Sequence, residues 1–433
     1  YGLNLAEIKQ RILKGGYNIV GVSCQFTALL EISIEICRIA KECGDPYVIV
    51  GGPHASARPE SLLSSKVVDY VCVGEGEKVI KEFVDCLKTG NIAGIKNIDG
   101  IAYSENGNIH LPEKISFIED LDTIPFPARD MFPIEKYFSK SSPMGGVFKS
   151  NKNLTILSSR GCPARCNFCA SARFWGKKVR YRSVENTLRE IKELKDKYGV
   201  EEIQFVDDNL TLNKKRALEL FKRMKEKAYN LPWSVPSGIA LWAIDEEIID
   251  AMKETGCHYV ALAIESGNQR VLTEVINKPT KLDKVPGICS YFRKKKITIG
   301  AFFVIGFPDE TLDEIRDSFR FALKCDLDNA NFFFATPLPG SPLWDQAEKE
   351  NLFIEGFSLK DIKYDRPSLK SKNWTIQELM DVAQYCKRVF YLKTFLRHPR
   401  VLLFRIFEML KKDPMRLFSV ISNQIFSRKI IEK

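Results

Sequence analysis

The chain reads Ser158-Ser159-Arg160-Gly161-Cys162-Pro163-Ala164-Arg165-Cys166-Asn167-Phe168-Cys169, and its three cysteines lie close enough together to share one metal centre. A structural zinc site needs four protein ligands, and an electron-transfer cubane needs four cysteines. The next cysteine after Cys169 is Cys257, far along the chain. Three local ligands leave one iron position open for a substrate or cosubstrate, so the pattern indicates a catalytic iron–sulfur cluster on Cys162, Cys166 and Cys169. The alternatives are a zinc knuckle completed by a distant residue and three unrelated buried thiols.

The region around this loop repeats a short apolar strand followed by a helix. The strands are expected at 154–157, 202–206, 233–235, 259–264, 298–305 and 331–334. Six such units predict a partial (β/α)6 barrel of the TIM type, whose chemistry lies in the loops that follow the strands. The cysteine loop follows the first strand, which supports a catalytic role.

The spacing Cys162-x-x-x-Cys166-x-Phe168-Cys169 resembles the signature of the radical S-adenosylmethionine (SAM) superfamily. The resemblance implies that the cysteines hold a 4Fe–4S cluster whose fourth iron binds the amino and carboxylate groups of SAM. It further implies that the reduced cluster cleaves SAM to methionine and a 5′-deoxyadenosyl radical, which abstracts hydrogen from a substrate. Phe168 would pack beside the adenine.

Other strand ends carry polar groups that the same resemblance assigns to SAM. It places Asp207, Asp208 and Asn209 near the amino group of SAM, although Asp and Asn are also favoured as helix caps. It places Glu265 and Ser266 at the ribose or the methionine end. It implies a close approach of adenine at Gly306, while Asp309 to Thr311 could instead begin a helix.

Residues 1 to about 120 alternate strand and helix in a second pattern. Strands are expected at 19–23, 47–52 and 70–74, and helices at 29–40 and about 77–87. Short apolar strands spaced by helices predict a parallel, Rossmann-like sheet covered on both faces. Gly51, Gly52 and Gly74 end strands, where glycine lets a ligand approach the backbone. By pattern alone, a purely structural layer is an equal alternative.

Two stretches of this region, Val50 to Ser56 and Asp69 to Glu77, resemble the cobalamin-binding domain that precedes the radical domain in one subgroup of the superfamily. The resemblance implies that Ser23, Gly51 and Gly52 face the nucleotide tail of cobalamin, with Gly74 as a further cofactor residue. The Asp-x-His-x-x-Gly loop of many cobalamin proteins is absent from the sequence. The first strand and helix of that domain are also missing, so we expect that Tyr1 begins a fragment or a processed numbering.

The expected organisation is therefore an α/β chain in four parts. A partial Rossmann-like cobalamin-binding domain spans 1–120 and contains a hairpin signal at Asn106-Gly107-Asn108 near its end. A linker spans 121–150, and the partial barrel spans 151–350. Residues 351–433 form a helical, basic C-terminal region.

Composition places limits on location and partners. Twelve cysteines without paired spacing favour a reducing compartment, so we predict a cytoplasmic protein. Most of the net charge of +10 comes from 387–433, which holds 12 Lys or Arg and three acids. The mixed apolar and basic stretches 402–407 and 415–418 are favoured as a solvated helix packed on the barrel, the alternatives being peripheral contact with anionic membrane lipid or with a hydrophobic, acidic substrate or carrier. No nucleic-acid-binding module is present, so no nucleic-acid partner is expected.

Three functions remain open. The first is cobalamin-dependent methyl transfer to an unactivated carbon of a small or lipid-like molecule, with flavodoxin or ferredoxin as the reductant. The second is oxidative ring closure or rearrangement, as in the members that resemble the anaerobic magnesium-protoporphyrin ester cyclase. The third is a non-catalytic cobalamin or redox sensor. Methylthiotransferases share the barrel but carry a second cysteine triplet, which the N-terminal cysteines do not match.

Overall fold

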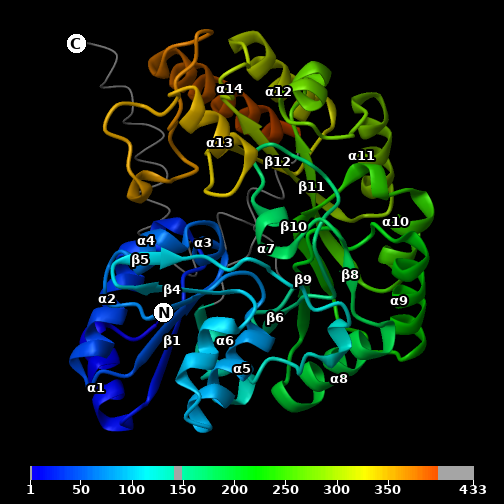
Figure 1. Ribbon diagram of the computed structural model, residues 1–433. Helices are drawn as coiled ribbons and strands as arrows, with labels where there is room; N and C mark the ends of the chain where they lie inside the picture. The colour runs from blue at the N-terminus through cyan, green and yellow to red at the C-terminus, as the bar shows by residue number, and fades with distance from the viewer. Residues whose placement is uncertain (1, 141–148, 398–433) are drawn as a thin grey trace.

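The computed structural model describes residues 2–140 and 149–397, and two sheets organise them (Figure 1). The N-terminal sheet has the order β1-β2-β3-β4-β5, in which the first three strands are parallel and the last two antiparallel. Its strands are β1 (Ile19–Ser23), β2 (Tyr47–Gly51), β3 (Tyr70–Cys72), β4 (Ile101–Glu105) and β5 (Asn108–His110). Its helices are α1 (Leu5–Gly15), α2 (Leu30–Glu42), α3 (Pro53–Ala57), α4 (Pro59–Leu63) and α5 (Gly76–Lys88). The Rossmann-like prediction is confirmed, with a hairpin added at one edge.

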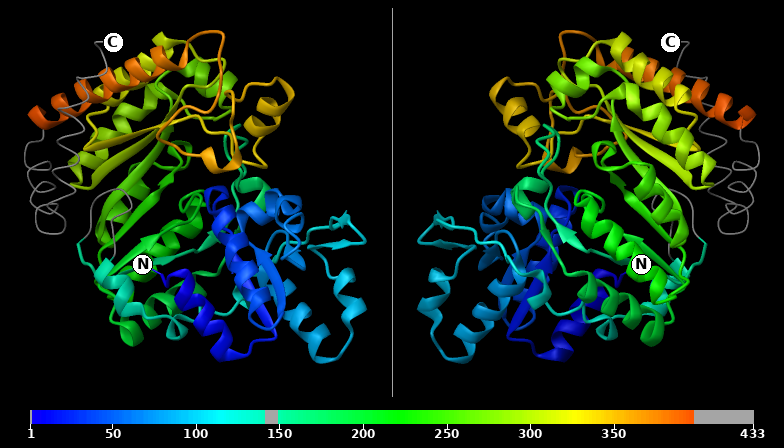
Figure 2. Two further views of the ribbon diagram at one scale, coloured as in Figure 1. Left: turned by 90° about the vertical axis from the view of Figure 1, so that its left-hand side faces the viewer. Right: turned by 90° about the vertical axis from the view of Figure 1, so that its right-hand side faces the viewer.

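The second sheet is parallel throughout, with the order β13-β12-β11-β10-β9-β6, and it curves into a partial barrel (Figure 2). Its six strands in the described residues are β6 (Asn153–Ile156), β9 (Glu202–Phe205), β10 (Trp233–Ile239), β11 (Cys257–Glu265), β12 (Thr298–Ile305) and β13 (Asn329–Phe334). The surrounding helices are α8 (Val184–Tyr198), α9 (Lys214–Glu226), α10 (Glu246–Glu254), α11 (Val285–Lys294), α12 (Leu312–Lys324), α13 (Pro342–Lys349) and α14 (Ile376–Arg397). The predicted partial (β/α)6 barrel is confirmed.

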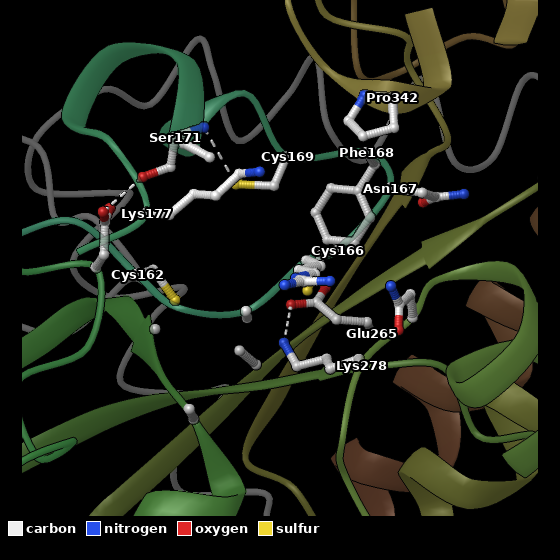
Figure 3. Close-up of a pocket in the computed structure, with 18 of the residues that line it drawn as sticks. Cys162, Cys166, Asn167, Phe168, Cys169, Ser171, Lys177, Glu265, Lys278 and Pro342 are labelled. Atoms are coloured by element: carbon white, nitrogen blue, oxygen red, sulfur yellow. Dashed lines mark hydrogen bonds and ion pairs between the residues drawn. The ribbon is translucent and has the colours of Figure 1, made fainter. Parts of the chain in front are cut away.

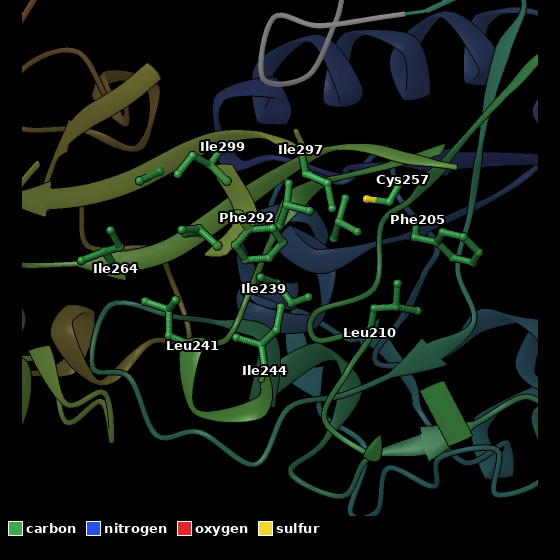
Figure 4. Packing of buried hydrophobic residues seen from close by; sticks show 14 of the residues in the cluster. Phe205, Leu210, Ile239, Leu241, Ile244, Cys257, Ile264, Phe292, Ile297 and Ile299 are labelled. Carbon is green, nitrogen blue, oxygen red and sulfur yellow. The ribbon is translucent and has the colours of Figure 1, made fainter. Parts of the chain in front are cut away.

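The main core lies between this sheet and its outer helices. Figure 4 shows part of it, including Phe205, Ile239, Ile264, Phe292 and Ile299, which are all fully buried. Burying each such side chain contributes about 1.5–3 kcal/mol. The core therefore holds the strands firmly, and the loops at their carboxyl ends start from fixed positions.

Side-chain caps fix where the helices of the barrel begin. Thr311 is the N-cap of α12 and forms a capping box with Glu314, so the helix-start alternative for Asp309 to Thr311 is confirmed. Asn213 is the N-cap of α9. The helix-cap alternative for Asp207 to Asn209 is therefore wrong, because the cap lies further along the loop.

The two sheets meet at the ends of their strands (Figure 2). Helix α3 contacts α7 (Ser171–Trp175), which belongs to the loop after β6, and Arg173 Nε donates to the Ser56 carbonyl at 3.3 Å. The connecting segment is tied to the barrel by a buried ion pair of 2.6 Å between Arg129 and Glu190 on α8. The carboxyl ends of the parallel strands of both sheets consequently lie on the sides where the two domains meet.

The C-terminal stretches 402–407 and 415–418 lie outside the described residues. Helix α14 precedes them and packs against α12. Within residues 2–140 and 149–397, every helix is too short or too polar to cross a membrane.

We predict that the Rossmann-like domain loses stability in acid through His54. Its Nδ1 lies 3.0 Å from Thr27 Oγ1 and its Nε2 lies 3.0 Å from Ser61 Oγ. Burial, and then Arg58, lower the pKa of His54 to about 4. Because the folded pKa lies below the unfolded value of about 6.5, this stability is present above pH 6.5 and is lost as the pH falls towards 4.

Urea unfolding should show that the free energy of unfolding is about 1–3 kcal/mol lower at pH 4.5 than at pH 7 because of His54. The substitution His54→Gln should abolish this part of the pH dependence. The same substitution at the exposed His110 on β5, His110→Gln, is the matched control. Equal pH dependence of the wild type and His54→Gln would contradict the prediction.

Candidate cofactor site

The cysteine loop leaves β6 through a narrow two-stranded ribbon. Strand β7 (Ser159–Arg160) pairs antiparallel with β8 (Arg180–Tyr181). Gly161 follows with φ of +92°, and a Cβ there would lie 2.6 Å from the Lys178 carbonyl oxygen. Only glycine fits this turn, both for its left-handed backbone and for the close approach. The tight turn directs the next residue, Cys162, away from the ribbon.

Backbone hydrogen bonds anchor the rest of the loop. The Asn167 N–H donates to the Ile276 carbonyl at 2.9 Å, and the Leu343 N–H donates to the Asn167 carbonyl at 2.8 Å. The Cys169 N–H donates to the Cys166 carbonyl at 3.1 Å. The loop is thus held by segments that follow β11 and β13, so its cysteines have defined positions.

Cys162, Cys166 and Cys169 line one cavity of about 860 Å³ (Figure 3). No three His, Cys, Asp or Glu side chains in the described part of the chain gather around one point, as ligands of a single ion would. A 4Fe–4S cube would bind each of the three cysteines at a different iron, and all three line this one cavity. Burial raises the pKa of Cys166 to about 12 and that of Cys169 to about 11. Metal ligands are thiolates, so binding here must release protons.

Phe168 and two carboxylates join the cysteines at this cavity. Phe168 lines it and lies 6.2 Å from Phe307, ring centre to ring centre. Asp208 and Glu265 also line it. Ser171 Oγ donates to Asp208 at 2.6 Å. The structure thus brings together the predicted cluster ligands and three of the predicted SAM residues, whose contacts with SAM stay predictions.

Asp207 lies elsewhere although it is the neighbour of Asp208. Its fully buried carboxylate accepts from Ser158 Oγ at 2.8 Å, from Ser159 Oγ at 2.5 Å and from the Ser158 N–H. It therefore fixes the first residues of the cysteine loop. Asn209 is also buried, and neither amide atom has a hydrogen-bond partner among the described residues. Asn209 does not line this cavity, so its predicted contact with SAM stays a prediction.

Ser266 and Gly306 occupy packed positions outside the lining of this cavity. Ser266 Oγ lies 3.3 Å from Ser318 Oγ. The Gly306 N–H donates to Glu310 Oε2 at 2.7 Å, and a Cβ at Gly306 would meet Leu379 at 2.8 Å. Their predicted contacts with SAM also stay predictions.

Lys278, the buried partner of the predicted residue Glu265, is the part of the site that sequence reasoning missed. Glu265 ends β11 with φ of +70°, an uncommon conformation for a residue with a side chain. It accepts from Lys278 Nζ at 2.9 Å, and the two side chains are 8% and 5% exposed. Burial lowers the pKa of Lys278, but Glu265 and Cys166 outweigh it and the net pKa is raised. Glu265 and Cys166 therefore favour the ammonium form of Lys278, which lines the cavity that holds the thiols.

A second cavity of about 460 Å³ lies at the strand ends of the N-terminal sheet. The predicted residues Ser23, Gly51, Gly52 and Gly74 all line it. Gly52 has φ of +106°, and a Cβ there would lie 2.8 Å from the Cys24 carbonyl oxygen. Glycine at position 52 thus permits two backbone segments to approach closely beside this cavity, and the predicted contacts of these residues with cobalamin stay predictions.

A third cavity of about 520 Å³ has lining residues in common with each of the first two. It shares Phe168, Cys169 and Asp208 with the cysteine cavity and Trp175 with the cavity of the N-terminal sheet. Its other walls are largely apolar and aromatic. They include Phe302, Phe333, Phe334, Leu338 and Tyr364. The cysteine loop and Pro53 of the Rossmann-like domain therefore both contribute to the wall of this third cavity.

Comparison with known proteins agrees with this two-part site. Residues 156–322 match the family model described as the radical SAM superfamily, and residues 2–84 match the model described as the B12 binding domain. The chain is 34% identical to an uncharacterized methyltransferase of Pyrococcus horikoshii, over 94% of this chain and 84% of that protein. It is 31% identical to the cytidylyl-2-hydroxyethylphosphonate methyltransferase of Streptomyces wedmorensis, over 90% and 78%.

Two further likenesses are more distant. The chain is 26% identical to the anaerobic magnesium-protoporphyrin IX monomethyl ester cyclase of Rubrivivax gelatinosus, over 91% of this chain and 69% of that protein. The cobalamin-dependent SAM radical enzyme OxsB shares the fold, with a TM-score of 0.71 at 15% identity over all of this chain and 70% of OxsB. This chain belongs to the radical SAM superfamily, in the group that carries a B12 binding domain. It is a radical SAM enzyme whose cofactors are a 4Fe–4S cluster, SAM and cobalamin.

We predict that Lys278→Met destabilises the protein by about 3–5 kcal/mol, because it leaves Glu265 as a buried charge without its partner. The added change Glu265→Gln should restore part of the loss. Lys225→Met removes a pair of similar length, 2.8 Å to Glu254, whose side chains are 61% and 58% exposed. That control should cost less than about 1 kcal/mol. Denaturant unfolding of the cofactor-free proteins measures the free energy of unfolding of Lys278→Met, of its double variant with Glu265→Gln and of Lys225→Met. An equal loss of stability in Lys278→Met and Lys225→Met would contradict the prediction.

Proposed function

We propose that this enzyme transfers a methyl group to an unactivated carbon of a small molecule bound in the third cavity. The observation that carries the proposal is the lining of that cavity. Cys169, Asp208 and Glu265 reach it from the barrel, while Pro53 reaches it from the Rossmann-like domain. A substrate there would touch the surroundings of both cofactors at once.

The residues of the chain would divide the work between the two sides. Cys162, Cys166 and Cys169 would hold three irons, and Asp208, Glu265 and Phe168 would position SAM. Ser23, Gly51, Gly52 and Gly74 would admit the cobalamin tail. When bound, the cluster and SAM supply a hydrogen-abstracting radical and cobalamin supplies a methyl group. Asp207, Asn209, Ser266 and Gly306 would support this arrangement from behind the cavity wall.

The walls of the third cavity favour a substrate with an apolar or planar part. Phe302 and Phe333 have ring centres 6.0 Å apart, and Tyr364 meets Phe333 edge-on at 6.0 Å. Aromatic walls of this kind exclude water and contact flat ligands well. A lipid-like substrate fits the same chemistry.

An external reductant completes the proposal. Arg165 and Lys177 are exposed and line the cysteine cavity. These cations support an acidic electron donor such as flavodoxin or ferredoxin, since opposite charge steers association. Cytoplasmic location, peripheral membrane contact by the basic C-terminal helices and the lack of a nucleic-acid partner stay predictions.

Oxidative ring closure or rearrangement is the second candidate function. The likeness to the magnesium-protoporphyrin ester cyclase and the aromatic walls favour it. It would use the same residues without delivery of a methyl group. The third reading, a non-catalytic sensor, is not retained because the chain belongs to an enzyme family.

Anaerobic reconstitution with iron, sulfide and hydroxocobalamin tests the proposal, followed by addition of SAM under reducing conditions. Remethylation of bound cobalamin should give about one S-adenosylhomocysteine per chain without substrate, together with the absorbance of methylcobalamin. 5′-Deoxyadenosine should also form. Deoxyadenosine without S-adenosylhomocysteine would favour ring closure or rearrangement, and the absence of both products would contradict the proposal.

We predict that Cys166→Ala abolishes the cluster absorbance and deoxyadenosine formation but leaves cobalamin binding intact. The physical reason is that Cys166 lines the cysteine cavity and not the cavity of the N-terminal sheet. Cys386→Ala on α14 is the control and should keep both cofactors. Deoxyadenosine formation by Cys166→Ala at the wild-type rate would contradict the assignment of the cluster ligands.

A further inference from the structure

Glu75 joins the Rossmann-like domain to the barrel. It follows Gly74 at the end of β3, and its side chain is fully buried. Oε1 accepts from Arg160 at 2.9 Å, and Oε2 accepts from Arg180 at 2.7 Å. Oε2 also accepts from the Ile118 N–H at 2.6 Å. A carboxylate of one domain is therefore held by two guanidinium groups of the other.

Both arginines belong to the ribbon from which the cysteine loop begins. Arg160 on β7 and Arg180 on β8 are directly paired in register. Only Gly161 separates Arg160 from Cys162, and the turn at that glycine has no spare room. A displacement of Arg160 must therefore move the first cysteine of the loop.

The same side chains form a wall of the proposed cobalamin cavity. Glu75, Glu77 and Trp175 all line it. Glu77 pairs with Arg160 at 2.5 Å, and the Arg160 guanidinium lies 4.7 Å from the centre of the Trp175 ring. One cluster of contacts thus faces cobalamin on one side and holds the cysteine loop on the other.

Stability alone does not account for this arrangement. Burial favours the neutral acid, but Arg180, the Ile118 N–H and Arg160 outweigh it, so the pKa of Glu75 is lowered. Buried ion pairs can often be replaced by apolar residues at little cost in stability, because removing the charges from water offsets much of their attraction. Apolar contacts, however, would not fix the direction of the bonds to each carboxylate oxygen of Glu75, as the two guanidinium groups do.

We infer that Glu75 is a positioning residue that fixes the cysteine loop against the cobalamin cavity and so sets the separation of the two cofactors. The inference rests on the cofactor sites proposed above. It does not require Glu75 to touch the substrate or the reacting atoms.

The reduced cluster and cob(II)alamin are both paramagnetic, so pulsed electron paramagnetic resonance on the loaded enzyme reports the distance between them. The wild type should give one narrow distribution. Glu75→Gln keeps the size of the side chain and removes its charge, so the distribution should become at least twofold broader while iron and cobalamin contents remain those of the wild type. Arg180→Lys should give an intermediate width, because it keeps the charge but loses the forked geometry.

Glu190→Gln is the matched control. Glu190 is a buried carboxylate on α8 that also accepts from two arginines, Arg129 and Arg182, but it lines neither cofactor cavity. It should lower stability and leave the distance distribution narrow. Arg180→Lys serves as the test if Glu75→Gln does not fold.

Three outcomes would overturn the inference. The first is an unchanged distribution in a fully loaded Glu75→Gln or Arg180→Lys protein. The second is equal broadening in Glu190→Gln, which would show a general loss of rigidity. The third is loss of cobalamin alone from the Glu75→Gln protein, which would show that Glu75 holds cobalamin itself rather than the cysteine loop. A wild type that lacks either signal would contradict the proposed function itself, and the inference with it.

Discussion

The buried carboxylate of Glu75 between Arg160 and Arg180 is the constraint on which the arrangement of this enzyme depends. Each domain has its own core and positions its own strand ends, but neither core fixes one domain relative to the other. The ion pair between Arg58 and Glu348 across the interface is a weaker constraint, because its side chains are 34% and 49% exposed. Exposed pairs contribute about 1 kcal/mol or less and tolerate movement, whereas a buried charge strongly resists losing its partners.

Parallel strands explain why the functional groups collect where they do. All strands of the barrel end on the same side, so the cysteine loop after β6, Asp208 after β9 and Glu265 at the end of β11 share one cavity. The N-terminal sheet offers its own carboxyl edge, open because of glycines, to the same interior. Glu265 lies at this edge with an uncommon backbone conformation, φ of +70°, and its side chain is held by the buried partner Lys278.

Local patterns predicted the elements well because each pattern reports burial along one segment. The apolar run 298–305 is β12 as predicted, and the helix expected at about 77–87 is α5 (Gly76–Lys88). The cysteine triplet could be placed because its spacing is short and its chemistry specific. The direction in which a side chain points within a segment was harder to predict. Asp207 and Asp208 are the same residue type, yet Asp207 faces the loop after β6 and Asp208 faces the cavity.

Contacts between distant segments left no signal in the sequence. Glu75 lies 85 residues from Arg160 and 105 from Arg180. Lys278 follows an irregular stretch in which no periodicity marks an inward-facing cation. Such pairs exist only because two folded units meet, so they depend on topology rather than on local preference.

The same interface bears on the choice between methyl transfer and ring closure. Both reactions begin with removal of hydrogen from a substrate carbon, and they differ in what that carbon meets next. A methyl group can be delivered only if cobalamin lies within bonding reach of the substrate carbon. Ring closure, in contrast, requires that cobalamin does not react with this carbon first. The residues that decide between them are therefore not confined to those that touch SAM. They include the residues that set how far the Rossmann-like domain stands from the barrel, and Glu75 is the buried group that joins the two.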